Sequence, residues 1–247
     1  MSEPNISRAV ILAAGRGTRM GGITEEIPKP MLPIHGRPML DHILERLQAA
    51  GISRFLIVIG YHGEVIQNHF KNGHPEIEFV RQNPVDGTGS GALLAKTFAA
   101  VDPFLLTYGD ILCEPAEYLR ANAILAGRPD CAAAIAVKAV ADPWQGAAVY
   151  EEEGKITAII EKPPKGSSTT HWNSAGFYVF RAVIFDYLSR LQPSPRGEYE
   201  LTSALDSMLS DGLELRISPV EGIWRDVGRP EDLAALNSVN TLKSTKY

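Results

Sequence analysis

The sequence predicts an α/β fold, and three observations support this prediction. In the first half, short apolar runs typical of buried strands alternate with amphipathic segments typical of helices. In the second half, strand-like segments follow one another without full helices between them, which indicates antiparallel pairing. The chain has 247 residues and a hydrophobic content of 45%, so it can bury a substantial core, and we expect one domain over residues 1–247.

The first half begins with an apolar run at residues 9–14 that has the length and branching of a buried strand. Leucine and isoleucine side chains share one helical face between residues 38 and 50, so we expect a helix there. The later elements of this half are predicted strands at 55–59, 77–80 and 104–107 and predicted helices at 63–71, 91–101 and 115–126. In such a sheet, ligands bind beyond the carboxyl ends of the strands, where Gly15, Gln82 and Asp110 would lie.

The second half contains predicted strands at 131–137, 146–150, 156–160, 177–180 and 213–217. Predicted helices at 183–191, 201–209 and 230–237 would lie on its flanks. Trp144 and Trp172 flank this half and could border the pocket, although core packing is the expectation we favour.

Composition excludes several classes of partner. A net charge of -5 and a pI of about 5.7 argue against a nucleic-acid backbone as the main ligand. Cys113 and Cys131 are too few for a disulfide framework and are not spaced as a metal pair, which favours a reducing, cytoplasmic location. No apolar run has the roughly 20 residues that span a bilayer, and residues 1–8 lack the apolar core of a signal peptide, so we expect no membrane partner.

A loop rich in glycine and arginine follows the first predicted strand, in the segment AVILAAGRGTRMGGITEEIPKPMLPI at residues 9–34. Gly15 and Gly17 free the backbone, while Arg16, Arg19 and Lys29 place cations around uncovered amides. This combination suits a triphosphate. The glycine spacing satisfies neither the dinucleotide-binding pattern G-x-G-x-x-G nor the P-loop pattern.

The motif L-A-A-G-R-G-T-R-M followed by P-K-P-M-L-P-I resembles the signature of sugar-1-phosphate nucleotidyltransferases, the nucleotide-sugar pyrophosphorylases. The resemblance is nearest to the uridylyl and thymidylyltransferase branches. It implies a Rossmann-like, three-layer α/β/α mixed sheet with a small antiparallel sugar-binding half. Residues from about 8 to 130 would form the nucleotide-binding half, and residues from about 131 to 240 the sugar-phosphate-binding half.

The resemblance implies a set of residues that bind the nucleotide. In that family, a glutamine and a G-T-G at this spacing recognise a pyrimidine base, because glycine lets the base lie against the backbone and glutamine offers both a donor and an acceptor. Without the resemblance, the same stretch would be a turn leading into a helix capped by Thr88 or Ser90. The implied nucleotide-binding residues are Ala13, Ala14, Gly15, Arg16, Gly17, Gln82, Gly87, Thr88, Tyr108 and Gly109.

Two aspartates match the metal ligands of the family. Asp110 follows T-Y-G, and Asp226 lies in W-R-D-V-G, which matches the family pattern W-x-D-x-G. The resemblance therefore implies Mg²⁺ as the cofactor, since this ion accepts one or two carboxylates together with phosphate oxygens and water. The two aspartates would then have to meet at the mouth of the sheet. The implied catalytic residues are Arg19, Lys29, Asp110, Lys162 and Asp226.

A second set matches the sugar-phosphate site of the family. Glu161-Lys162-Pro163 resembles its E-K-P motif, in which the glutamate binds sugar hydroxyls and the lysine meets the sugar phosphate. The other reading of this motif is a solvated charge pair before a turn. The implied sugar-phosphate-binding residues are Gly146, Glu161, Lys162, Ser174 and Glu198, the last in G-E-Y-E-L-T, where Thr202 would serve equally as a helix cap.

The chain departs from the family at two points. The family pattern N-[TA]-G is replaced by Asn173-Ser174-Ala175-Gly176, which puts the asparagine one residue early or places Ser174 in its position. This leaves recognition of an N-acetyl sugar open. The first loop also reads M-G-G-I-T-E-E-I instead of the usual leucine-proline-threonine version, so its fit around the triphosphate can differ.

Together these motifs predict an enzyme that transfers a nucleotidyl group from a nucleoside triphosphate to a hexose 1-phosphate, giving an NDP-sugar and pyrophosphate. UTP is the first expectation for the nucleotide and dTTP the second. Two alternatives stay open: a cytidylyltransferase that acts on phosphocholine or a polyol phosphate, and a non-catalytic homologue that senses nucleotide sugars. Little sequence follows the last predicted helix, so we expect a single activity. A homo-oligomer is among the states that relatives adopt.

Overall fold

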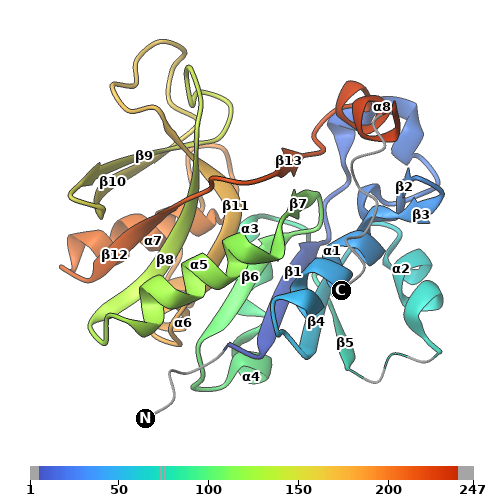
Figure 1. Ribbon diagram of the computed structural model, residues 1–247, viewed down its shortest axis with the longest axis horizontal. Helices are drawn as coiled ribbons and strands as arrows, with labels where there is room; N and C mark the ends of the chain where they lie inside the picture. The colour runs from blue at the N-terminus through green and yellow to red at the C-terminus, as the bar shows by residue number, and fades with distance from the viewer. Residues whose placement is uncertain (1–5, 73, 75, 239–247) are drawn as a thin grey trace.

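The structure is a computed structural model, and it describes residues 6–72, 74 and 76–238. The two ends of the predicted domain, residues 1–5 and 239–247, lie outside this range, as do residues 73 and 75. Its centre is a nine-stranded mixed sheet in the order β5-β4-β1-β6-β11-β8-β12-β10-β9 (Figure 1). Helices cover both faces of this sheet, so the predicted three-layer α/β class is confirmed.

The parallel part of the sheet forms from the apolar runs of the first half. β1 (Arg8–Ala13) lies between β4 (Arg54–Ile59) and β6 (Phe104–Tyr108), and β5 (Ile77–Arg81) pairs with β4. Residues 9–11 of β1 have no exposed surface, because they are apolar on both faces and both faces are covered. These strands place their carboxyl ends, and the loops that follow, at one edge of the sheet.

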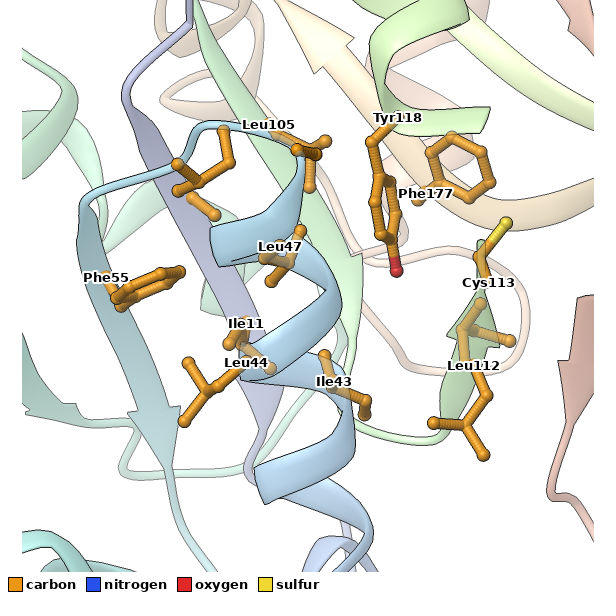
Figure 2. Close-up of a cluster of buried hydrophobic side chains, with 14 of the residues drawn as sticks. Ile11, Ile43, Leu44, Leu47, Phe55, Leu105, Leu112, Cys113, Tyr118 and Phe177 are labelled. Carbon is orange, nitrogen blue, oxygen red and sulfur yellow. The ribbon is translucent and has the colours of Figure 1, made fainter. Parts of the chain in front are cut away.

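One face of the sheet is covered by α1 (Met39–Ala49), α2 (Gly63–Phe70) and α5 (Pro115–Ala126). Figure 2 shows the α1 side chains Ile43, Leu44 and Leu47 pointing toward β1, within a cluster that also includes Tyr118 and Phe177. The rings of Tyr118 and Phe177 meet edge to face, with centroids 5.0 Å apart, so α5 is packed against the middle of the sheet.

The opposite face is covered by α3 (Thr88–Leu93), α4 (Lys96–Ala99), α6 (Ile184–Leu188) and α7 (Leu201–Ser210). The single helix predicted at 91–101 is wrong, because α3 begins earlier and the chain breaks before α4. Leu94 and Ala95 have ψ angles of -18° and -3°, and the Ala95 amide bonds to Ala92 O in a tighter turn. Neither glycine nor proline marks this break in the sequence.

The second half continues the same sheet through β11 (Trp172–Phe180), which pairs antiparallel with β6 and with β8 (Cys131–Ala139). β10 (Lys155–Glu161) pairs antiparallel with β9 (Ala147–Glu152), as predicted. β12 (Glu214–Pro219) is the exception, since it is parallel to β8. Because β10 also pairs with β12 and β9 with β11, these five strands close into a ring beside the parallel strands.

Short elements that the sequence does not predict gather at the carboxyl edge of the sheet. They are the 3-10 helices η1 (Thr18–Thr24) and η2 (Lys29–Met31), the hairpin β2 (Pro33–Ile34) with β3 (Arg37–Pro38), and the antiparallel ribbon of β7 (Ile111–Cys113) with β13 (Trp224–Asp226). The last helix, α8 (Pro230–Ser238), lies beside the hairpin (Figure 1). Across residues 6–72, 74 and 76–238, no helix combines the length and apolar character that crossing a membrane requires.

Candidate active site

A cavity of about 730 Å³ opens at the carboxyl ends of β1 and β6 and extends between the two halves of the sheet. Its wall contains every predicted site residue except Arg16. They are Ala13, Ala14, Gly15, Gly17, Arg19, Lys29, Gln82, Gly87, Thr88, Tyr108, Gly109, Asp110, Gly146, Glu161, Lys162, Ser174, Glu198 and Asp226. Residues that are up to about two hundred positions apart in the chain therefore share one site.

The glycine-arginine loop enters the cavity after β1 and is anchored on its outer side. Gly17 has a φ of 66°, and a Cβ there would lie 3.1 Å from Cβ of Lys29, so this turn needs glycine. Tyr61 Oη and His62 Nε2 both lie at hydrogen-bond distance from Glu25 O, at 3.0 and 2.8 Å. Arg16 is exposed and its guanidinium lies 5.2 Å above the Tyr61 ring, outside the cavity wall.

Lys29 and Asp110 form an ion pair in the wall of the cavity. Lys29 belongs to η2 and is only 8% exposed, while Asp110 follows β6. Lys29 Nζ donates to Asp110 Oδ2 at 2.5 Å. The sequence predicts a phosphate-binding cation and a metal ligand at these two positions, and the structure places them in direct contact.

Asp226 reaches the same point from the far end of the chain. The β7–β13 ribbon pairs Asp226 with Ile111, and the Val227 amide donates to Asp110 O at 3.0 Å. Burial within the cavity, followed by the nearby charge of Asp110, raises the pKa of Asp226 to about 6, while Lys29 acts in the opposite direction. The two aspartates thus meet at the mouth of the sheet, and their role as metal ligands stays a prediction.

These two carboxylates suit a magnesium ion that is shared with a substrate. Across the part of the chain that the structure describes, no three histidine, cysteine, aspartate or glutamate side chains gather in a way that could hold a metal by themselves. Mg²⁺ accepts one or two carboxylates and completes its shell with phosphate oxygens and water. The oxygen donors of Asp110 and Asp226 therefore fit this ion, with a bound triphosphate supplying further oxygens.

Gln82 lies buried at the other end of the nucleotide side, with its amide held in one orientation. Its Nε2 donates to Gly87 O at 2.8 Å and to Ser90 Oγ at 2.9 Å, and Ser90 Oγ donates to Asp86 Oδ1 at 2.5 Å. Because the Gly87 carbonyl can only accept a hydrogen bond, the nitrogen of the Gln82 amide must face it. The bonds to Gly87 and Ser90 use both hydrogens of this nitrogen. For a ligand, Gln82 therefore offers only the acceptor Oε1, whereas the motif suggests both a donor and an acceptor.

The predicted helix caps have other partners. No side-chain cap bond is present at the start of α3. Thr88 Oγ1 instead accepts the Leu201 amide of α7 at 3.0 Å, so this hydroxyl joins the two halves of the chain. Thr202 Oγ1 donates to Glu161 Oε2 at 3.2 Å. Both threonines are therefore bound across the cavity and neither caps its own helix.

Carboxylates gather at the sugar side of the cavity around one guanidinium. Arg196 pairs with Glu200 at 2.9 Å, with Glu198 at 3.1 Å and more loosely with Glu161 at 3.9 Å. Burial first, and the charge of Glu200 second, raise the pKa of Glu161. Sequence reasoning missed Arg196 and Glu200, although the alternating charges of R-G-E-Y-E beside the predicted Glu198 are a signal that could have found them.

Lys162 follows Glu161 at the end of β10 in an unusual backbone conformation. Its φ is 45°, in the left-handed region that a lysine rarely adopts, and its amide donates to Gly146 O at 2.7 Å. The side chain is exposed to the cavity. The hairpin β9–β10 thereby presents Glu161 and Lys162 at its open end, beside Gly146.

Both polar residues that the sequence offers for this position of β11, Asn173 and Ser174, line the cavity. Ser174 Oγ lies 2.8 Å from Tyr178 Oη, which lies 3.3 Å from Tyr108 Oη, so a chain of hydroxyls runs from the sugar side to the nucleotide side. A Cβ at Gly146 would lie 2.3 Å from Asn173 Oδ1, so a larger residue there would require the Asn173 side chain to move.

The two tryptophans of this half behave differently. Trp172 is partly buried and packs against the core between the sheet and α7, as predicted. Trp144 is 37% exposed and lines the cavity, with Lys165 Nζ 5.5 Å from its ring centroid, so it borders the pocket instead of packing in the core as the favoured expectation had it. It lies on the loop before β9, which turns the ring toward the cavity mouth.

Comparison with known proteins identifies relatives over nearly the whole chain. The model of the nucleotidyl transferase family matches residues 8–242. The bifunctional protein GlmU of Methanococcus maripaludis is 37% identical over 231 residues, which cover 93% of this chain and 53% of that protein. The UTP–glucose-1-phosphate uridylyltransferase AglF of Haloferax volcanii is 34% identical over 238 residues, which cover 91% of this chain and 93% of that protein.

A solved structure of similar shape is UDP-glucose pyrophosphorylase in complex with UDP-glucose. It superposes with a TM-score of 0.84 at 24% identity and covers 94% of this chain and 97% of its own. This likeness shows a shared fold. The chain spans about half the length of the GlmU relatives that it matches.

Proposed function

Because this chain belongs to the nucleotidyl transferase family, we propose that it transfers a nucleotidyl group from a nucleoside triphosphate to a hexose 1-phosphate and releases pyrophosphate. The family that the sequence motifs predict is confirmed by the match. The observation that carries the proposed activity is the single cavity in which Lys29, Asp110 and Asp226 meet between a cationic loop and a group of carboxylates. Residues from about 8 to 130 would bind the nucleotide, and residues from about 131 to 240 the sugar phosphate.

The nucleotide side supplies groups that match a pyrimidine triphosphate. Gly15 and Gly17 expose the backbone of the loop, and Arg19 and Lys29 add positive charge beside it. A polyphosphate is stabilised by such amides and cations. Gln82 Oε1 would accept a hydrogen bond from the base, while its nitrogen stays bound to Gly87 O.

The sugar side supplies groups that match a phosphorylated ring. Glu161 and Glu198 would accept hydrogen bonds from sugar hydroxyls, and Lys162 would neutralise the acceptor phosphate. A sugar-phosphate oxygen would then attack the α-phosphorus in line with the departing pyrophosphate, so that one P–O bond forms as another breaks. No side chain becomes covalently attached, and catalysis consists of positioning and charge neutralisation.

Asp110 and Asp226 would hold Mg²⁺, which would supply positive charge to the phosphate oxygens during transfer. Lys29 compensates the charge of Asp110. Asp226, by contrast, meets the like charge of Asp110, which contributes to its raised pKa. A cation between the two carboxylates would relieve this repulsion.

For the nucleotide, UTP is the first proposal and dTTP the second. AglF, which aligns over nearly its full length, is named as a UTP–glucose-1-phosphate uridylyltransferase, and this name supports uridylyl transfer to a hexose 1-phosphate. Cys113 and Cys131 are both free and buried, which is compatible with a reducing cytoplasm as the proposed location.

The test is pyrophosphate release in the presence of Mg²⁺ across UTP, dTTP, CTP, GTP and ATP, each against glucose, N-acetylglucosamine, mannose and galactose 1-phosphates and phosphocholine. We expect turnover with UTP and one of the sugar phosphates, and none after the metal is chelated. Activity with phosphocholine alone would replace the proposal with a cytidylyltransferase-type acceptor. Silence with every pair would favour a non-catalytic sensor of nucleotide sugars.

A further inference from the structure

A buried carboxylate lies outside the cavity, on α5, the helix that follows β7. Glu117 of α5 is 2% exposed and does not line the cavity. Removing a carboxylate from water is costly unless hydrogen bonds and opposite charge compensate it. The groups that bind the Glu117 carboxylate therefore indicate the role of this residue.

Those partners belong to the turn that leads into β13. Glu117 Oε1 accepts the Gly222 amide at 2.8 Å, and Oε2 lies 3.4 Å from the Glu221 amide. Arg120, one helical turn further along α5, lies 3.3 Å from Glu117 and pairs with Glu221 at 2.9 Å. Glu117 thus binds two consecutive amides of a turn that is more than a hundred residues away in sequence.

The turn packs closely against α5. A Cβ on Gly222 would lie 2.4 Å from Glu114 Oε2 and 2.9 Å from Glu117 Oε1, so a side chain there would displace one of these carboxylates. The Glu114 amide donates to Ile223 O at 3.2 Å, which fastens the next residue as well. Three consecutive residues of the turn are therefore bound to the start of α5.

This turn leads directly into β13, the strand of the ribbon that carries Asp226. β13 begins directly after Ile223, and its three residues pair with β7 so that Asp226 lies opposite Ile111, next to Asp110. A ribbon of three residue pairs is too short to specify its own register, and a slip of one residue would turn Asp226 to the other face. Trp224 Nε1 adds one bond, to Ala175 O at 2.8 Å.

From these contacts we infer that Glu117 is a positioning residue for the nucleotidyl transfer site: it sets the register of the β7–β13 ribbon and thereby the approach of Asp226 to Asp110. This inference rests on the proposed function, because the paired aspartates are its proposed metal site. Glu117 acts from outside the cavity, through the backbone of residues 221–223.

The direct test is Glu117→Gln, which keeps the size of the side chain but removes its charge and one acceptor. Mn²⁺ binding is measured by electron paramagnetic resonance, alone and with the non-hydrolysable analogue α,β-methylene-UTP. We expect the dissociation constant for Mn²⁺ to rise about tenfold or more, as for other groups that orient metal ligands. We also expect kcat to fall while the KM for the sugar phosphate stays near that of the wild type.

Two further variants separate positioning from general damage. Glu221→Gln changes only the exposed side chain that pairs with Arg120 and leaves the bonds from Glu117 to the turn, so Mn²⁺ affinity should change less than twofold. Gly222→Ala places a methyl group against the Glu114 and Glu117 carboxylates and should reproduce the effect of Glu117→Gln. Amide hydrogen exchange of residues 224–227, measured without metal well below the melting temperature, should accelerate in Glu117→Gln and Gly222→Ala and stay unchanged in Glu221→Gln.

The inference is overturned if Glu117→Gln melts at a lower temperature but keeps wild-type Mn²⁺ affinity and wild-type exchange in residues 224–227. That result would make Glu117 a stabilising residue only. If the wild type neither binds Mn²⁺ nor releases pyrophosphate, the proposed function fails by itself. Exchange in the metal-free ribbon then still decides the role of Glu117, because faster exchange in the variant supports it and unchanged exchange refutes it.

Discussion

The two sides of the cavity differ in charge. On the nucleotide side, Arg19 and Lys29 lie beside an exposed loop backbone. On the sugar side, the carboxylates of Glu161, Glu198 and Glu200 outnumber the cations of Lys162 and Arg196. A triphosphate is attracted to the first and repelled by the second, whereas a sugar ring offers hydroxyl donors that suit carboxylates. The charge distribution therefore favours one orientation of the two substrates, with their phosphates meeting near Asp110 and Asp226.

The two sides also differ in how they are held in place. On the nucleotide side, the loop that would bind the triphosphate is built from backbone turns in one stretch of chain, where Gly17 packs against Lys29. The sugar side is built from side chains on separate elements, with Glu161 on β10 bonded to Thr202 on α7. Substitutions on the nucleotide side should therefore change phosphate binding, and substitutions on the sugar side should change acceptor binding.

The largest effect is expected where the two sides meet. Asp110→Asn removes the charge that pairs with Lys29 and one of the two proposed metal ligands. Loss of metal stabilisation is worth several kcal/mol, so kcat/KM for both substrates should fall by roughly a thousandfold or more, measured as pyrophosphate release. The circular dichroism spectrum should stay that of the wild type. A folded variant with near-wild-type turnover would remove Asp110 from the mechanism.

A smaller effect that is confined to the nucleotide side is expected for Lys29. Lys29→Met keeps the buried stem but removes the charge near the triphosphate and leaves Asp110 unpaired. We expect kcat/KM for the nucleotide to fall by about a hundredfold, since a preorganised donor of this kind contributes on the order of 3 kcal/mol. The KM for the sugar phosphate should change little. An equal rise in both KM values would show that the two sides are not separable.

The sugar side should give the complementary result. Glu161→Gln replaces a carboxylate that accepts from Thr202 and faces the cavity. The KM for the sugar phosphate should rise about tenfold, as expected when one hydrogen bond to a charged group is lost, while the KM for the nucleotide stays constant. Initial-rate measurements with each substrate varied in turn would distinguish this from a change in kcat alone. An unchanged sugar KM would argue that Glu161 serves only to bind Arg196 and Thr202.

The ionisation of Glu161 should make the KM for the sugar phosphate depend on pH. Burial and the charge of Glu200 raise the pKa of Glu161, so its protonated form persists to a higher pH than for an ordinary glutamate. Because only the ionised form accepts from two hydroxyls, the KM for the sugar phosphate should rise as the pH falls from 7 toward this pKa. The substrate phosphate titrates in the same range, and Glu161→Gln measured over the same pH series corrects for it. A parallel profile in the two proteins would contradict the prediction.

The parts of the fold that were predicted from sequence are those with a strong local pattern. The strand at residues 9–14 and the helix at 38–50 agree with β1 and α1 to within one residue at each end, because an apolar run and a helical stripe are local signals. The β7–β13 ribbon was missed because Trp224-Arg225-Asp226 has no alternating apolar pattern. Its pairing depends on contacts to α5 that are far apart in sequence.

The candidate site shows the same contrast between local sequence signals and contacts that join distant residues. The motifs around Gly15, Asp110 and Glu161 indicated residues that the structure places on one cavity wall, since each lies at a strand end. Arg196 and Glu200 were missed because their importance comes from their position opposite β10. Sequence motifs indicated the groups that face a substrate, but not the neighbours that orient those groups.

The smallest effect is expected at the contact that joins the two sides. Thr88 Oγ1 accepts the Leu201 amide at 3.0 Å, which ties α3 on the nucleotide side to the first residue of α7 on the sugar side. Thr88→Val keeps the shape of the side chain but leaves this amide without its acceptor, and Leu201 is fully buried. Loss of such a cap costs about 1 kcal/mol, which corresponds to a decrease of about 2–4 °C in melting temperature for a protein of this size.

Thr88→Ser retains the acceptor and is the matched control, which should melt within about 1 °C of the wild type, because Thr88 is exposed and loses only a methyl group. If Thr88 mainly joins the two sides, Thr88→Val should raise both KM values by a similar small factor, because the walls shift relative to each other. A rise in the nucleotide KM alone would instead place the hydroxyl in direct contact with the triphosphate or base. The ratio of the two KM changes therefore decides whether the two sides of the cavity act as one rigid unit or as separate binding surfaces.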